Sequence, residues 1–490
     1  MTISQAIQSA MSGLQATQTQ AAIVSQNIAN AQTQGYVRKD VNLGNRIVNG
    51  VGMGVEVQGI SRKVDEYLIR DMRIVAAKVG RQDVLSASLT VFTDLVGQPQ
   101  DERSLTSALG KLDRALQELG NAPEDATLQK SAVAAAEALI SSFQTIDRGV
   151  QKAREDADSQ IDSIVRNVNS SLHRIDDLNR QIAGQASAGI DTSDLRDERD
   201  RLLDSLARDL PINVIQSGHS VVVMTKGGVT LLDNAVHELG FQAAAIIPAN
   251  SVYVAPPAAS PLSGLMVDGV DVSFSSTYPG AIGEGTLAGL FEIRDSIMPL
   301  VQKQADELAA NVAAAFQNAD ATVAGAPPAD TGLFTDNGGP VDPLTYMPGL
   351  AGRLSVNGLV EANAALLRDG IHAPVAGAAG DPTQVHAFQA VFSQTFAFDP
   401  GAGLQTAAKL TEFAASATAD IQKIRSDADR AHVAQSLVLS GLSNTRLNRD
   451  GVNIDDEMQK MLSIERSYAA SAQVISMANA MLDSLFEAMR

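Results

Sequence analysis

Mostly apolar residues recur every three or four positions along the N-terminal end of the chain. They are Ile3, Ile7, Ala10, Leu14, Thr17, Ala21, Val24 and Ile28, and this alternation of spacings is typical of a coiled-coil helix. Several of these positions hold Ala or Thr, so the stripe can bury little area and the isolated helix would be marginally stable. We therefore expect a helix from Ile3 to about Asn30 whose stripe packs against a partner.

The C-terminal end repeats the pattern at Met461, Ile464, Tyr468, Ser471, Ile475, Ala478, Leu482, Leu485 and Met489. No charged residue lies between Ser467 and Leu482, and Met458, Leu462 and Phe486 widen the apolar face. A hairpin of the two terminal helices closed within one molecule is one interpretation, and packing against neighbouring molecules is the other. The absence of charge on the outer face favours an assembly.

Helical periodicity also predicts segments from Asp65 to about Val96, over 126–183, and from Leu195 to Leu210. Within the last of these, Arg196 and Asp200 are four residues apart, as are Asp197 and Arg201. We interpret them as solvated ion pairs worth a few tenths of a kcal/mol each, so replacing Asp197 by Ala should have little effect.

Short β-branched runs replace the helical pattern after Pro211. They cover 212–215, 220–225, 229–232 and 270–274, and the turn formers Gly227-Gly228 and Asp268-Gly269 separate them. An earlier alternating run covers 52–62, and helical patterns return over 285–316 and 404–442. We therefore predict a mainly α fold, a long coiled-coil-like helical bundle with an inserted β domain and paired N- and C-terminal helices.

This pattern predicts a nested domain layout. Residues 1–70 and 446–490 would form a terminal coiled-coil domain. Residues 71–210 and 285–445 would form a central helical domain with a loop insertion around 320–400, and 211–284 a small outer β domain. Along the sequence, helices would come first, the β domain would follow, and helices would come last, so the two terminal segments would lie side by side.

Composition excludes several classes of function. The 490 residues include 37 basic and 56 acidic side chains, for a net charge of -19, which argues against binding to nucleic acid or to anionic membranes. The chain has no Cys, so thiolate metal sites and disulfides are excluded. No run of 18 apolar residues and no secretory signal pattern occur, so we expect any export to use another route.

The sequence contains no recognisable catalytic or metal-binding motif. The six histidines are His173, His219, His237, His372, His386 and His432, and none of them has HxxxH or HExxH spacing. A nucleophile elbow and a phosphate-binding loop are also missing. We therefore expect no catalytic residues, no bound metal and no cofactor.

Both ends of the chain carry a recognisable motif. The first helix is followed by Asn27-Ile28-Ala29-Asn30, a short spacer with Thr33, and Gly35-Tyr36. The other end contains the segments 451–458 and 465–472. Together they resemble the rod, hook and hook-associated family of flagellar axial proteins. The patterns over 52–73, 194–204 and 285–295 resemble its hook-associated branch.

The resemblance implies a structural protein of the hook–filament junction, outside the cell, exported by the flagellar type III system without a cleaved signal peptide. Its implied partners are copies of itself in a ring, hook protein, the next hook-associated junction protein, and an export chaperone on the C-terminal helix. The residues that we expect to mediate assembly are Ile3, Ile7, Leu14, Ala21, Asn27, Ile28, Asn30, Gly35, Tyr36, Met461, Ile464, Tyr468, Ile475, Leu482 and Leu485.

Three alternatives remain at this point. One is another flagellar axial subunit, either a hook or a distal rod protein, although such relatives are mostly β between their termini. A second is an enzyme such as a peptidoglycan hydrolase. A third is a soluble intracellular coiled-coil scaffold.

Overall fold

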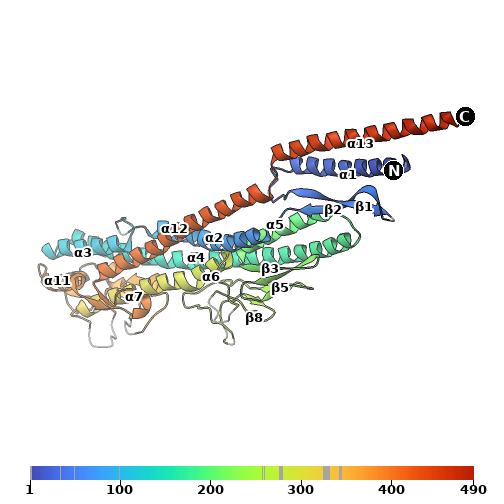
Figure 1. The fold of residues 1–490 in the computed structure, drawn as a ribbon. Helices are drawn as coiled ribbons and strands as arrows, with labels where there is room; N and C mark the ends of the chain where they lie inside the picture. Colours follow the sequence, from blue (N-terminus) through green and yellow to red (C-terminus); the bar gives the residue numbers. More distant parts are fainter. Residues whose placement is uncertain are drawn as a thin grey trace. The chain divides into compact units, whose positions relative to one another are not determined.

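A computed structural model describes residues 3–489 except 34, 49, 99, 257, 259, 275–279, 324–330 and 342–344. The fold is mainly α, as the sequence predicts (Figure 1). The long helices are α1 (Ile3–Ala29), α2 (Glu66–Val96), α3 (Leu105–Asn121), α4 (Ala126–Ser187), α5 (Ser193–Asp209), α7 (Met298–Ala319), α12 (Leu410–Asp450) and α13 (Ile454–Ala488).

Helix bounds follow the periodicity closely, with two extensions and one omission. α4 continues through Gly184, where the sequence predicted a break, and ends at Ser187. α12 begins at Leu410, six residues later than predicted because 407–408 form strand β12, and runs on to Asp450. Helix α3, which was not predicted, is capped by Ser104, whose side chain accepts from the Ser107 amide.

Helix α6 (Thr286–Glu292), the π-helical turn η1 (Ile293–Ile297) and α7 form the helical region predicted over 285–316. Four short helices lie within the region predicted as a loop insertion: α8 (Leu350–Arg353), α9 (Gly358–Ala362), α10 (Leu366–Asp369) and α11 (Thr383–Ala390). Parts of that predicted insertion, 324–330 and 342–344, lie outside the described residues.

The described strands form small antiparallel sheets. β1 (Lys39–Val48) pairs with β2 (Val51–Arg62), and β3 (Ile212–Ser217), β4 (Ser220–Thr225) and β5 (Thr230–Leu232) form a three-stranded sheet. A second such sheet contains β6 (Leu239–Gly240), β7 (Met266–Val267) and β8 (Val270–Asp271). The remaining pairs are β9 (Phe334–Asp336) with β10 (Leu354–Val356), and β11 (Phe396–Ala397) with β12 (Ala407–Ala408).

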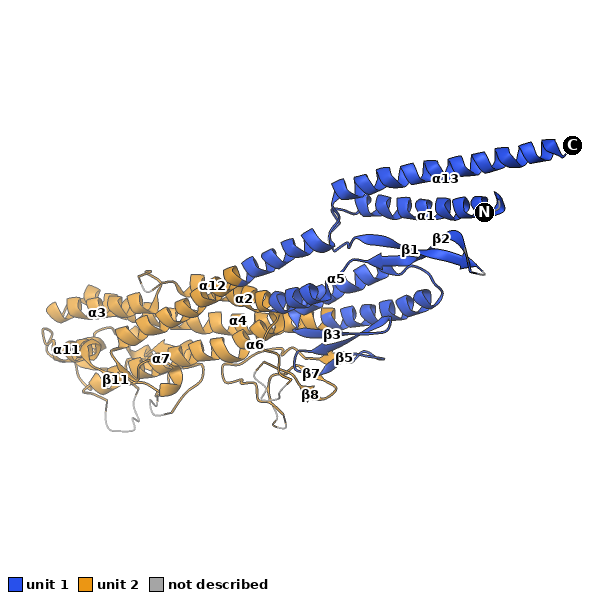
Figure 2. Cartoon of the chain, viewed as in Figure 1, with its two compact units in different colours: residues 1–77, 168–238, 435–490 blue, residues 78–167, 239–434 orange. Residues whose placement is uncertain are grey.

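The chain divides into two compact units (Figure 2). Unit 1 contains Met1–Ala77, Val168–Glu238 and Gln435–Arg490, and unit 2 contains Lys78–Asn167 and Leu239–Ala434. The sheet β3–β5 belongs to unit 1 and the sheet β6–β8 to unit 2, so the units group 211–284 differently from the single β domain that we expected. The three-domain layout stays a prediction of the sequence.

Unit 2 holds a large aromatic and aliphatic core. Phe316 is fully buried and packs edge-to-face on Phe334, with ring centroids 5.2 Å apart. Near η1, the buried Arg294 guanidinium binds Asp158 at 2.6 Å and Asp295 at 2.9 Å. The buried Arg154 donates to the Arg294 carbonyl at 3.0 Å, so α4 and η1 are held together by paired, hydrogen-bonded charges.

Candidate functional site

Helices α1 and α13 pack side by side and run antiparallel within unit 1 (Figure 1). Asn27 near the end of α1 contacts Glu457 near the start of α13. Farther along, a Cβ on Gly13 would lie 3.2 Å from the Ser471 hydroxyl, so glycine permits a close approach here. The pairing of the terminal helices therefore occurs within one chain.

The predicted assembly residues in this pair of helices differ in how much of each side chain is exposed to solvent. On α1, Ile3, Ile7, Leu14, Ala21 and Ile28 are half-buried, and so are Met461, Ile464, Ile475 and Leu482 on α13. Tyr468 and Leu485 are exposed. Contact of these side chains with a neighbouring molecule stays a prediction.

The hairpin β1–β2 also contacts α1. The Val55 amide donates to the Ser12 hydroxyl at 3.1 Å. Gly54 adopts φ +105°, and a Cβ there would come within 3.0 Å of the Ser9 backbone, so only glycine fits this crossing. Helix α1 is therefore covered by α13 and by the hairpin.

Helix α13 carries a second apolar stripe that remains exposed. It consists of Val474, Met477, Met481 and Leu485, with exposed fractions between 39% and 55%. Their spacing of three or four residues places them along one line of the helix, and the helix has no charge between Ser467 and Leu482. We call these four residues the free stripe. A contiguous exposed apolar stripe of this kind marks an interaction surface.

Asn27 connects the first motif to both terminal segments. Its amide oxygen accepts from the Tyr36 hydroxyl at 2.9 Å and from the Lys39 amide at 3.1 Å. Its amide nitrogen donates to the Lys39 carbonyl and to Glu457 Oε2, both at 2.9 Å. Asn27 and Glu457 are fully buried, so every hydrogen-bonding position of the amide is used inside the protein.

The other motif residues shape the turn that follows α1. Asn30 Nδ2 donates to the Gln26 carbonyl at 3.0 Å, and Gly35 adopts φ +80°. Burial and the nearby carboxylates of Asp194, Asp197 and Glu457 raise the pKa of Tyr36, so its hydroxyl keeps the proton that it donates to Asn27.

Two members of this cluster, Lys39 and Glu457, were not predicted from the sequence. Each lies beside or inside a quoted motif, but the sequence gives no signal that two segments 430 positions apart share a hydrogen bond. Lys39 is almost completely buried, and its ammonium reaches Asp194 at 2.5 Å.

Four carboxylates line one side of α5, and we call Asp194, Asp197, Asp200 and Asp204 the acidic row. Their spacing of three, three and four residues keeps them on one helix face. Each of them binds a cation from another element of unit 1. Lys39 binds Asp194, and Arg62 binds both Asp197 at 2.7 Å and Asp200 at 2.6 Å. Asp204 is bound by Arg73 at 2.7 Å and by Arg446 at 3.0 Å.

The prediction of solvated ion pairs within α5 is therefore wrong for Asp197. This residue is 3% exposed and pairs with Arg62 of β2 rather than with Arg201. Burial raises its pKa to about 6 against the opposing attraction of Arg62. A rule based on spacing within one helix cannot detect that a strand supplies the partner.

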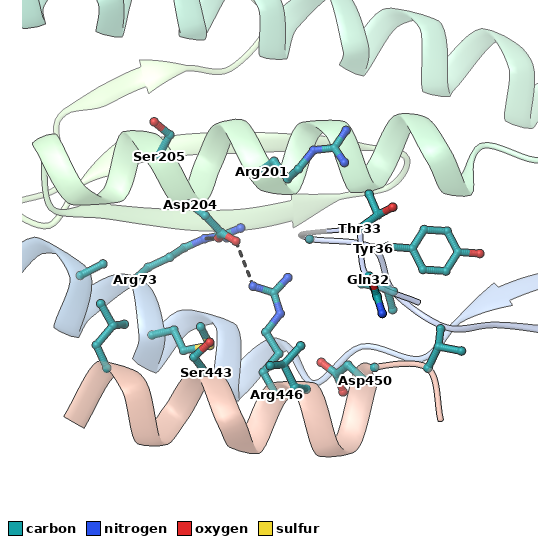
Figure 3. A pocket seen from close by; sticks show the side chains of 18 of the residues that line it. Gln32, Thr33, Tyr36, Arg73, Arg201, Asp204, Ser205, Ser443, Arg446 and Asp450 are labelled. Carbon is teal, nitrogen blue, oxygen red and sulfur yellow. Dashed lines mark hydrogen bonds and ion pairs between the residues drawn. The ribbon is translucent and has the colours of Figure 1, made fainter. Parts of the chain in front are cut away.

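A groove of about 960 Å³ opens beside this row (Figure 3). The turn around Thr33 and Tyr36 forms one wall, and α2, α5 and the end of α12 form the others. Arg73 and Arg446 both point to Asp204 in the groove. Arg201 lies exposed near Thr33 and Tyr36, and its guanidinium has no hydrogen-bond or ion-pair partner among the described residues.

The described part of the chain contains no group of three or more His, Asp or Glu residues that could hold a metal ion. Among the same residues, no helix combines the length and the apolar character needed to cross a bilayer.

Three protein-family models match the chain, one at each end and one in the interior. The model "Flagellar hook-associated protein FlgK helical domain" matches residues 92–326. "Flagella basal body rod protein" matches 7–36, and "Flagellar basal body rod FlgEFG protein C-terminal" matches 444–487. The matches over 7–36 and 444–487 include the motifs around Asn27 and Glu457.

Relatives named flagellar hook-associated protein 1 align with the chain. The Bacillus subtilis protein is 23% identical and covers 99% of this chain and 98% of its own length. The Escherichia coli protein is 22% identical, with 99% of each chain covered. The Salmonella typhimurium protein is 25% identical over 64% of this chain and 56% of its own length.

A solved structure, the flagellar hook junction protein FlgK from Burkholderia pseudomallei, matches 55% of this chain and 45% of its own, with a TM-score of 0.42 and 23% identity. The family models and the full-length relatives agree with one another along the chain. The chain belongs to the family of flagellar hook-associated protein 1, structural proteins of the bacterial flagellum.

Proposed function

We propose that the chain is the structural subunit that connects the hook to the filament. The family relationship supports the junction role, and the motifs at both ends are those of an axial protein. Copies of the chain would form a ring between hook protein below and the next hook-associated junction protein above. The terminal helices would line the inner tube, in the nested three-domain layout predicted from the sequence.

The free stripe on α13 is the single observation that carries this proposal. Apolar side chains that stay exposed in one molecule gain free energy when a neighbouring molecule covers them, at about 25 cal/mol per Å² of apolar area. Methionines such as Met477 and Met481 adapt their shape to different neighbours. A junction subunit needs this property, because it contacts both its own copies and two other proteins.

The terminal pair also suits export through a narrow channel. Helix α1 buries mainly small or polar side chains, among them Ala10, Ser12, Ala16 and Thr17, so little apolar area stabilises the pair in the monomer. The chain would leave the cell by the flagellar type III route with these ends unfolded. Contacts in the assembly would then offset the entropy lost on ordering them.

An export chaperone on the C-terminal helix would cover the free stripe before export. An exposed apolar stripe promotes aggregation in the cytoplasm, so a protein that covers the stripe until export would prevent aggregation of the chain. This partner follows from the family resemblance and from the exposure of Met477 and Met481.

A deletion strain tests the junction role. Cells that lack the chain should build complete hooks, fail to attach filaments and release filament subunits into the medium, and the wild-type chain should restore filaments. Loss of the hook itself would indicate a hook or distal rod subunit instead. Peptidoglycan-cleaving activity of the purified protein would favour the enzyme alternative, and absence of the chain from sheared flagella would favour an intracellular scaffold.

A further inference from the structure

A cluster of basic side chains lies on unit 1 where the turn between β3 and β4 meets α5. It consists of Arg196 and Arg199 of α5 and His219 of the turn, and we call these three residues the basic corner. We infer that the basic corner binds an oxyanion, either a carboxylate or a phosphate group. This inference does not depend on the proposed junction role, because unit 1 of a single chain supplies all three residues.

The turn holds His219 against both arginines. Only Gly218 and His219 separate β3 from β4, and Gly218 adopts φ +61°, which glycine does without strain. Arg199 Nη1 donates to the His219 carbonyl at 3.1 Å, and Arg196 Nη2 lies 3.4 Å from His219 Nδ1. Because a guanidinium can only donate, the proton of the neutral ring lies on Nε2, directed away from Arg196.

Most guanidinium donors of the basic corner have no partner. A guanidinium carries five N–H donors, and Arg199 uses only Nη1, for the His219 carbonyl and for Asn179 Oδ1 at 3.0 Å. Among the described residues, neither arginine of the corner bonds to a carboxylate. Nε of each is buried without a partner, whereas Nη1 of Arg196 and Nη2 of Arg199 lack a partner but are open to solvent. An anion can therefore reach one nitrogen of each side chain.

Burial makes this uncompensated charge costly. Arg199 is 3% exposed, and neutral acceptors offset only part of the free energy lost when a charge leaves water. Burial lowers the pKa of Arg199 to about 10, with Asp200 opposing the shift and Arg196 adding to it. The guanidinium is still charged at neutral pH, so an anion beside the basic corner would be attracted to it.

The nearest carboxylates along α5 are bound by other cations. Glu198 accepts from Arg174 at 2.6 Å, and Asp200 pairs with Arg62 at 2.6 Å. Neither can neutralise the basic corner without losing its own partner. In a chain of net charge -19, this local excess of positive charge favours an anion from outside the molecule.

Titration of the dilute chain with inorganic phosphate tests the site. Isothermal calorimetry at low salt should show saturable binding in the millimolar range, and NMR of the His219 ring nitrogens should locate the phosphate at the turn. Arg196→Gln should weaken binding about tenfold, because it removes one charge-assisted contact. His219→Gln should also weaken it and serves to assign the ring signals.

Arg201→Gln is the matched control. Arg201 lies on the same helix, is exposed and has no ion pair among the described residues, but it is not part of the basic corner. Its replacement should leave the affinity for phosphate within about twofold of wild type. Circular dichroism checks that the variants keep the wild-type fold. Binding that does not saturate, or equal weakening by Arg196→Gln and Arg201→Gln, would overturn the inference.

Polymer formation distinguishes the two sources of the oxyanion. If a carboxylate of a neighbouring molecule occupies the basic corner, phosphate should slow assembly of the wild type more than chloride does at equal ionic strength, and Arg196→Gln should remove this difference. If the ligand is a free ion, phosphate and chloride should act equally on assembly. Both results retain the site and identify its ligand. A chain that never assembles contradicts the proposed function, whereas the phosphate titration still decides on the basic corner.

Discussion

At the scale of single residues, Asn27 holds three segments of unit 1 together. Its one amide group binds the turn at Tyr36, the backbone at the start of β1 and the carboxylate of Glu457 in α13. A side chain with fewer polar atoms would leave buried groups without partners, which costs about 1–3 kcal/mol for each group. Asn27 thus fixes the end of α1 against the start of α13.

Replacing Asn27 by Ala should lower the free energy of unfolding of unit 1 by about 3 kcal/mol, because the Lys39 backbone and Glu457 lose buried partners. Urea unfolding followed by amide exchange of α1 measures this loss. Asn30→Ala is the matched control, since Asn30 bonds mainly to its own helix end, and should cost about 1 kcal/mol. Equal losses for the two variants would contradict the role of Asn27.

Asp197 should give unit 1 a defined pH dependence. Its pKa is about 6 in the folded chain and about 3.8 when unfolded. Between pH 3.8 and pH 6 the carboxyl group is therefore mostly protonated in the folded chain and mostly ionised in the unfolded chain. Stability from this group is therefore greatest below pH 4 and falls as the pH rises to about 6. The full change is about 2–3 kcal/mol.

Asp197→Asn removes this titration while keeping the shape of the side chain. The difference in unfolding free energy between wild type and variant, measured in urea from pH 4 to 7, should decrease with rising pH and level off above pH 6. Other titrating groups cancel in the difference. A difference independent of pH would show that Asp197 does not carry the raised pKa.

At the scale of elements, α13 has two apolar faces in different surroundings. One face packs on α1 within the chain, and the free stripe stays open. Substitutions on the two faces should therefore have separable effects, and neighbouring positions of the helix allow a matched comparison.

Ile475→Asp and Met477→Asp form that comparison. Ile475 is half-buried in the monomer and Met477 is 55% exposed. Ile475→Asp should open the marginally stable α1–α13 pair already in the monomer, because it places an unpaired charge in an apolar contact. Met477→Asp should leave monomer unfolding within about 0.5 kcal/mol of wild type but prevent assembly. Wild-type assembly by Met477→Asp, measured by sedimentation, would exclude the free stripe as an interface.

Much of the helical architecture can be predicted from the sequence, and the side-chain networks cannot. Periodicity is a local signal, so it predicts both ends of α1 and the C-terminal end of α13 to within a few residues. The short amphipathic α3 and the pairing strand β1 were missed, although both lie beside elements that were predicted. Lys39 and Arg62 bind α5 from distant positions in the chain, and no spacing rule within one segment can reveal such partners.

At the scale of the whole molecule, the two units differ in how they are stabilised. Unit 2 encloses fully buried aromatic side chains such as Phe143 and Phe316 and carries most of the excess acidic charge of the chain. Unit 1 contains the terminal pair, in which α13 buries only Glu457 and Ala478. We therefore expect unit 2 to be stable in the isolated molecule and α13 to need neighbours.

Amide hydrogen exchange of the dilute chain and of the assembled polymer tests this central claim most directly. Amides of α7 should exchange slowly in both states, because the core of unit 2 is complete in the monomer. Amides of α13 between Ser467 and Leu482 should exchange at least a hundredfold faster in the dilute chain than in the polymer. Equal protection of α13 and α7 in the dilute chain would contradict the account.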